Sequence, residues 1–207
     1  MKQNQPIEFT EALVPYTHAE LAAKVAEKLT DSRFQHCLRV EQTSRKLAAL
    51  NGVDQELAGI TGLLHDYAKQ RSDETFIKLI KTRGLDPALL NYGNGVWHGV
   101  VGAELIKDEL RIYNEDILNA VRLHTVGAPY MPKLAQIVFM ADFIEPKRDF
   151  PGVDEARLVT RKSLADGVRY QIQHTLTYLI SQGAPVYPQT LATYNAWVGG
   201  VGTVPTK

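Results

Sequence analysis

Residues 57–66 read Leu57-Ala58-Gly59-Ile60-Thr61-Gly62-Leu63-Leu64-His65-Asp66, an apolar stretch that ends in an imidazole beside a carboxylate. Asp54 precedes the stretch at a position typical of a helix N-cap, so we expect a buried helix that carries the His65-Asp66 pair into the protein interior. An ionisable pair in such surroundings is costly unless something neutralises it. A bound cation would do so, and the pair therefore predicts a metal site.

The glycines of this stretch predict a close helix–helix contact. Asp66 shares a helical stripe with Gly59 and Gly62. Because neither glycine has a side chain, a neighbouring helix can approach the stretch closely at both positions.

The rest of the chain also has a helical pattern. Apolar residues recur at helical spacing in almost every segment, and no strand-like alternation is sustained, so we expect an all-α protein. Ser32 with Gln35 predicts a capping box at the start of one helix, and residues 84–95 carry loop signals. The expected helices cover approximately residues 18–29, 33–51, 55–66, 73–83, 96–110, 115–125, 132–145, 154–182 and 189–198.

Composition narrows the class of protein. The chain has 207 residues, which suits one domain; we expect an N-terminal extension at 1–17, the domain at 18–198 and a flexible tail at 199–207. Lys plus Arg equals Asp plus Glu at 23 each, which gives no support to nucleic-acid or membrane-surface binding. No run reaches the roughly 18 apolar residues of a membrane span. The single Cys37 fits a reducing compartment, so we expect a cytoplasmic protein.

Four further residues lie where their helices would turn them toward the His65-Asp66 pair. They are His36, His98, His124 and Asp142. Each lies on or beside an apolar stripe; His124, for example, follows Ile117 and Val121 at offsets of seven and three. A single inward histidine is more often a hydrogen-bonded core residue than a ligand. Six converging nitrogen and oxygen donors without a thiolate instead fit a metal site, and two ions fit better than one.

The order of these residues resembles that of the HD-domain metal-dependent phosphohydrolases, and the local motifs resemble the YqeK branch of that family. The motifs are Arg33-Phe34-Gln35-His36, Leu64-His65-Asp66-Tyr67-Ala68-Lys69, Trp97-His98-Gly99, His124-Thr125-Val126-Gly127, Ala141-Asp142-Phe143-Ile144-Glu145-Pro146, Lys147-Arg148-Asp149-Phe150-Pro151-Gly152-Val153 and Tyr187-Pro188-Gln189-Thr190 with Asn195. The resemblance covers roughly residues 18–198. It implies a single HD-type helical bundle that splits diadenosine tetraphosphate symmetrically into two ADP and holds a di-iron centre.

The resemblance also implies a division of the ligands. His36, His65, Asp66 and Asp142 would hold one metal, and Asp66 would bridge to a second metal held by His98 and His124. A water shared between two such ions would be largely hydroxide at neutral pH and would attack phosphorus. Iron is the expected metal; manganese and cobalt use the same donors and stay open.

Several further residues are candidates for catalysis or substrate binding. Lys69 lies three residues after Asp66, one helical turn away, and both are expected to be catalytic. Arg33, Lys69, Thr125 and Arg148 are the expected phosphate contacts. Each also has a plainer interpretation: the arginines as surface ion pairs, Lys69 as a solvated lysine, and the Thr125 hydroxyl as a group bonded to its own helix. By resemblance, Tyr187, Thr190 and Asn195 form a base or ribose pocket. The expected substrate contacts are Arg33, Lys69, His98, Thr125, Arg148, Tyr187, Thr190 and Asn195.

Other functions stay open at this point. The same metal ligands would serve a phosphohydrolase of nucleoside mono- or triphosphates or of an alarmone, because metal chemistry does not choose the leaving group. A non-catalytic nucleotide-sensing module is a second alternative, disfavoured because all six ligands are present. A homodimer formed through an exposed patch that includes Tyr194 or Trp197 also stays open.

Overall fold

The computed structural model describes residues 9–10 and 13–200. In this part of the chain every regular element is helical, which confirms the all-α expectation. The elements are α1 (His18–Ala26), α2 (Asp31–Asn51), α3 (Gln55–Leu64), α4 (Asp73–Thr82), the 3-10 helix η1 (Pro87–Asn91), α5 (Asn94–Val100), α6 (Gly102–Leu110), α7 (Glu115–Leu123), α8 (Lys133–Ile144), α9 (Val153–Lys162), α10 (Leu164–Ser181) and α11 (Pro188–Trp197).

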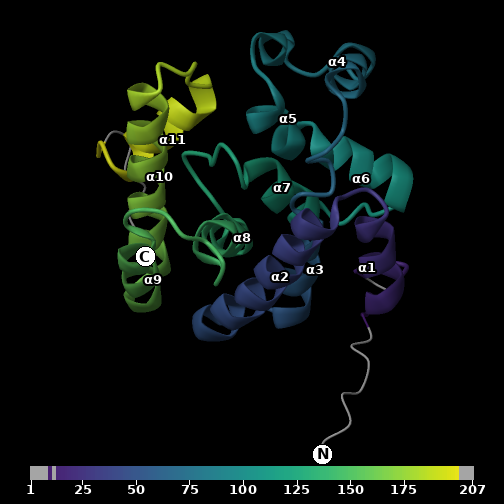
Figure 1. Cartoon of the computed structure of the whole chain (residues 1–207), viewed down its shortest axis with the longest axis horizontal. Coiled ribbons are helices and arrows are strands. Elements are labelled where there is room, and N and C mark those ends of the chain that lie inside the picture. Colours follow the sequence, from purple (N-terminus) through teal and green to yellow (C-terminus); the bar gives the residue numbers. More distant parts are fainter. Residues whose placement is uncertain (1–8, 11–12, 201–207) are drawn as a thin grey trace, which may run out of the picture.

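Helices α2 and α3 form the most extensive helix pair, and α8 packs against α2, α3 and α7 (Figure 1). Helices α9, α10 and α11 lie together on the far side of α8, whereas α1, α4, α5 and α6 lie on the opposite side of the molecule (Figure 1). Two apolar clusters result. Ile60 and Leu63 of α3 belong to the first and Ala58 to the second, so α3 runs between them.

Helix α3 begins and packs as its sequence predicts. The carboxylate of Asp54 accepts hydrogen bonds from the backbone N–H groups of Glu56 and Leu57 at 2.7 and 3.1 Å. A Cβ added to Gly62 would lie 2.7 Å from Ser44 Oγ and 3.0 Å from the Cα of Glu41 on α2, tighter than nearly all such contacts. The close approach of α2 to α3 therefore requires the glycine.

Several expected helix boundaries are wrong; the helix expected at 55–66, for example, ends at Leu64, before the His65-Asp66 pair. Helix α2 begins at Asp31 and its N-cap is Thr30, in extended conformation and without a side-chain cap bond, so Ser32 is not the cap. The expected helix at 96–110 divides between α5 and α6 at Val101. The expected helix at 154–182 divides at Ser163, whose backbone is extended (φ −154°, ψ 120°) and whose hydroxyl accepts from the Asp166 N–H at 3.2 Å. Within the expected loop at 84–95, residues 87–91 form η1.

Parts of the two terminal segments pack on the domain or lie outside the described residues. Phe9 and Val14 are buried in the first apolar cluster, and Thr10 bonds to Glu56. Residues 1–8 and 11–12 of the expected extension, and 201–207 of the expected tail, lie outside the described residues. Tyr194 and Trp197 are partly buried against the second cluster rather than forming an exposed patch. None of the described helices combines the length and apolar character that a membrane crossing requires.

Candidate metal centre

The six residues singled out in the sequence meet at one point. His36 comes from α2, His98 from α5 and Asp142 from α8. The His65-Asp66 pair follows the end of α3, and His124 follows the end of α7. All are buried except Asp142, whose side chain is 22% exposed. The centre is thus enclosed by helices that are far apart in sequence and is open toward Asp142.

Asp66 lies between the imidazoles and divides them into two pairs. Its Oδ2 is 3.4 Å from His65 Nε2 and 3.7 Å from His36 Nε2. Its Oδ1 is 3.3 Å from His98 Nε2 and 3.8 Å from His124 Nε2. One carboxylate therefore faces two groups of donors with its two oxygens, the arrangement of a bridging ligand.

Asp142 completes the pair formed by His36 and His65. Its Oδ1 lies 3.0 Å from His36 Nε2 and 3.7 Å from His65 Nε2. Donors about 2.1 Å from a common ion, at the angles of an octahedron, are about 3 Å apart. The observed separations are close to this value or slightly longer, so small shifts would let these atoms surround a cation.

The four imidazoles also have the orientation of metal ligands. In each ring Nδ1 lies near an oxygen acceptor, which leaves Nε2 directed into the centre. Nε2 of His36 and Nε2 of His65 are buried without a hydrogen-bond partner, a costly state that a metal ion relieves. The Nδ1 acceptors are Glu145 Oε1 for His36 (3.1 Å) and the backbone carbonyls of Gly62, Asn94 and Val121 for His65, His98 and His124 (2.7, 2.5 and 2.7 Å).

The buried carboxylates of Asp66 and Asp142 favour positive charge in the centre. Burial opposes the charged form of His65, yet the Asp66 and Asp142 carboxylates outweigh burial and raise the pKa of His65 to about 10. Burial would raise the pKa of Asp66, but the neighbouring His65 and His124 imidazoles hold it well below its usual value. Burial and the charge of His124 lower the pKa of His98 to about 3. The two carboxylates are therefore ionised, and without a metal the His65 imidazole carries the positive charge that balances them; a bound cation would take over that role and release the His65 proton.

Three of the expected substrate contacts are cationic side chains that border the centre. Arg33 donates to Asp66 Oδ2 at 2.9 Å, and Arg148 pairs with Asp142. The ammonium of Lys69 lies 3.3 Å from the ring nitrogens of His98, and burial lowers the pKa of Lys69. The Lys69 N–H donates to the Asp66 carbonyl at 2.8 Å, which places the two residues one turn apart.

Of the remaining expected substrate contacts, Thr125 adjoins the centre, whereas Tyr187, Thr190 and Asn195 lie on α11 or directly before it. Thr125 has a buried hydroxyl without a partner, directly after His124. Tyr187 packs edge-on against Tyr92, and Thr190 is buried beside it at the start of α11. Asn195 is exposed on α11, and no contact joins it to the centre in the described residues. The base or ribose pocket expected at these positions thus stays a prediction.

Sequence reasoning missed the role of Glu145. This residue lies within a quoted motif but has no assigned role there, although it is 2% exposed and contacts His36. A carboxylate three residues after Asp142 and directly before a proline was the available signal.

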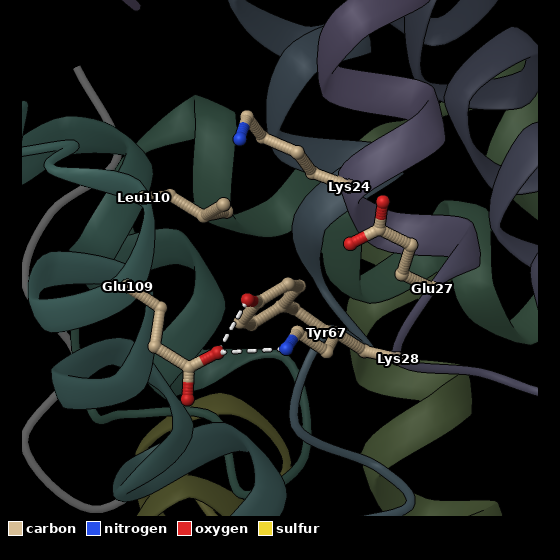
Figure 2. A pocket seen from close by; sticks show the side chains of 6 residues that line it. All are labelled: Lys24, Glu27, Lys28, Tyr67, Glu109 and Leu110. Atoms are coloured by element: carbon tan, nitrogen blue, oxygen red, sulfur yellow. Dashed lines mark hydrogen bonds and ion pairs between the residues drawn. The ribbon is translucent and has the colours of Figure 1, made fainter.

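A cavity of about 310 Å³ lies away from the centre (Figure 2). It is bordered by α1 and by the end of α6, and the Tyr67 hydroxyl donates to Glu109 inside it at 2.6 Å. None of the six ligand candidates lines this cavity. The chemistry suggested by the cluster therefore does not depend on it.

Comparison with known proteins agrees with this geometry. The HD-domain family model matches residues 33–147, a range that contains all six ligand candidates. A symmetrical bis(5'-nucleosyl)-tetraphosphatase from Halalkalibacterium halodurans is 40% identical over 171 residues, covering 83% of this chain and 91% of that protein. One from Bacillus subtilis is 39% identical over 181 residues, covering 87% and 97%.

A solved structure has the same fold. The crystal structure of a Clostridium acetobutylicum protein, described as a predicted HD superfamily hydrolase involved in NAD metabolism, superposes with a TM-score of 0.84 at 31% identity. The match covers 89% of this chain and 98% of that one. The chain therefore belongs to the HD-domain hydrolases, within the family of symmetrical bis(5'-nucleosyl)-tetraphosphatases.

Proposed function

We propose that this chain hydrolyses diadenosine tetraphosphate symmetrically and releases two ADP. The observation that carries the proposal is the division of four imidazoles by the two oxygens of Asp66, because this arrangement suits two cations held side by side. The relatives support the substrate, since their names specify symmetrical cleavage of a bis(5'-nucleosyl) tetraphosphate and they match most of this chain. In the reaction, a water oxygen bonds to a central phosphorus, the bond to the bridging oxygen breaks, and a proton is released.

We propose that the centre takes two metal ions. The first would be held by His36, His65, Asp66 and Asp142, and the second by Asp66, His98 and His124. When bound, such a pair supplies positive charge for the phosphate chain and acidifies a bound water. Iron is the proposed metal, with manganese and cobalt as alternatives that have the same ligand preference.

The cationic side chains have a second role once the ligand carboxylates are neutralised. Arg33 and Arg148 contact Asp66 and Asp142, and both guanidinium groups are about one third exposed, at 33% and 34%. Metal ions on the carboxylates would release the guanidiniums to donate to phosphate oxygens, which they can grip in a bidentate way. Lys69 lies at the His98 end and would offset charge that develops in the transition state.

A product-resolved assay tests the proposal. Purified full-length chain is incubated with ferrous or manganous ion and a panel of diadenosine tetraphosphate, ATP, AMP and a guanosine alarmone, in ¹⁸O-labelled water. We expect two ADP per dinucleotide, with one labelled oxygen in one of them. AMP with ATP, or released inorganic phosphate, would favour the other HD phosphohydrolase activities. Binding of a nucleotide without turnover would favour the sensing module, and either result would overturn the proposal.

A further inference from the structure

The four imidazoles of the centre differ in the acceptor that each Nδ1 faces. His36 alone among the four turns Nδ1 toward a carboxylate, that of Glu145, at 3.1 Å. The other three turn Nδ1 toward neutral backbone carbonyls. A carboxylate increases the basicity of a ligating imidazole more than a neutral acceptor does, so the two halves of the centre are electronically unequal.

Glu145 is fixed in place for this contact. Its Oε2 accepts from Arg39 Nε and from the backbone N–H of Lys147, both at 2.7 Å. The second Arg39 donor lies 3.3 Å from Oε1, the oxygen that faces His36. Glu145 thus accepts from a guanidinium and a backbone N–H, which are the partners of an ionised carboxylate.

The backbone explains why residue 145 reaches His36. Helix α8 ends at Ile144, and Glu145 leaves it with φ −51° and ψ 152°. Pro146 follows, and Arg157 of α9 donates to the Glu145 carbonyl at 3.0 Å. Asp142 in the last turn of α8 and Glu145 just beyond it thus contact the same imidazole, one at Nε2 and the other at Nδ1.

We infer that Glu145 is a positioning residue, which fixes the tautomer of His36 and strengthens its Nε2 as a metal ligand. The carboxylate holds the ring proton on Nδ1, so the Nε2 lone pair is available without a prior proton shift. The ion bound by His36, His65, Asp66 and Asp142 is consequently held more tightly than the one bound by Asp66, His98 and His124. The inference rests on the two-metal centre of the proposed function, but not on the identity of the substrate.

Cobalt(II) titration tests this inference, because the visible absorption of cobalt reports the strength of its nitrogen ligands. We expect two binding steps in the wild-type chain. Glu145→Ala should weaken the tighter step by about 10–100-fold and shift its absorption band, with the weaker step unchanged. Glu145→Gln keeps an oxygen acceptor for the Nδ1–H but removes the charge, so its loss should be smaller.

Glu41 provides a matched control. Like Glu145, it is a buried carboxylate that contacts a histidine and an arginine. Its Oε1 lies 3.0 Å from His18 Nε2 and 3.0 Å from Arg45 Nη2. Neither partner is a ligand of the centre. Glu41→Gln should lower the melting temperature to a similar extent as Glu145→Gln but leave both cobalt steps and their spectrum unchanged.

Several results would overturn the inference. These are wild-type affinity and spectrum in both Glu145 variants, equal weakening of both steps, or the same cobalt loss in Glu41→Gln. If Glu145→Ala does not fold, Glu145→Gln decides, because it preserves the shape of the side chain. A wild-type chain that shows the cobalt pattern but does not split diadenosine tetraphosphate would overturn the proposed substrate and leave the role of Glu145 standing.

Discussion

At the scale of single residues, the two oxygens of Asp66 hold the centre together. Replacing Asp66 with Ala removes the ligand that faces all four imidazoles, so we expect bound metal and hydrolysis to fall to background. Helical content should be largely retained, because the apolar clusters do not include the carboxylate. Metal analysis, product assay and far-ultraviolet circular dichroism measure the three quantities. His18→Ala, which removes a histidine outside the centre, should keep both metal and activity.

Lys69 is a charged side chain next to the centre that is not among the metal-ligand candidates, so its replacement tests the effect of charge on turnover alone. Lys69→Ala should lower turnover by about 100-fold, the usual effect of removing one donor to a developing charge, while metal content stays at the wild-type level. Lys107→Ala, which removes a lysine that pairs with Glu104 and Glu115 on another surface, should leave turnover unchanged. Equal rates for Lys69→Ala and wild type would show that Lys69 has no catalytic importance.

The convergence of the six ligand candidates was predictable from the sequence because ionisable residues on apolar stripes are costly to bury without a partner. His36 alone would have fitted a hydrogen-bonded core residue equally well, and only the joint set of six indicated a metal site. The role of Glu145 was not predicted, because a carboxylate after the last helical turn has no periodic neighbours to show which way it points. The exposure of Asn195 was not predicted either, because its place in the expected base or ribose pocket depended on a motif and not on a helical face.

At the scale of helices, the contact between α2 and α3 sets the separation of His36 from His65. Gly62→Ala should push these helices apart, because the added Cβ would lie 2.7 Å from Ser44 Oγ and 3.1 Å from the Val40 carbonyl. We expect a loss of about 1–3 kcal/mol in the free energy of unfolding, the usual cost of overpacking, and weaker metal binding. Denaturant unfolding and metal titration measure the two effects.

Gly95 on α5 is the control for this change. A Cβ at Gly95 meets nothing within 4 Å, so Gly95→Ala should leave stability unchanged or raise it slightly. A Gly62→Ala variant as stable as Gly95→Ala would show that the α2–α3 contact tolerates the extra methyl group.

The helical class followed from apolar periodicity, but the breaks at Val101 and Ser163, which raise the number of helices, did not. Val101 keeps helical backbone angles (φ −93°, ψ −26°), so the chain passes from α5 to α6 without leaving helical conformation. At Ser163, the polar residue that ends α9 also caps α10, and the apolar pattern continues across it. Tertiary packing decides both positions.

At the scale of the whole molecule, metal binding should stabilise the fold, since it joins α2, α5, α8 and the ends of α3 and α7. At a free ion concentration of 100 times Kd, linkage predicts about 2.7 kcal/mol. For a chain of this size that corresponds to a rise in Tm of roughly 5–10 °C. Thermal unfolding of the wild-type chain with manganous ion and with chelator measures the shift. Asp66→Ala should show none, and an equal shift in that variant would place the stabilising ion elsewhere.

The ligands come from widely separated parts of the chain, and this affects how the centre is assembled. His36 lies on α2, and His65 and Asp66 directly follow α3, the neighbouring helix, whereas Asp142 lies on α8, many residues later. Closing so long a loop is slow compared with forming the α2–α3 pair. A nascent chain therefore first offers an incomplete set of donors, from which a wrongly captured ion can escape. The donor set is complete only when α8 docks, so we expect tight metal binding to appear with the folded protein and not with the isolated α2–α3 segment.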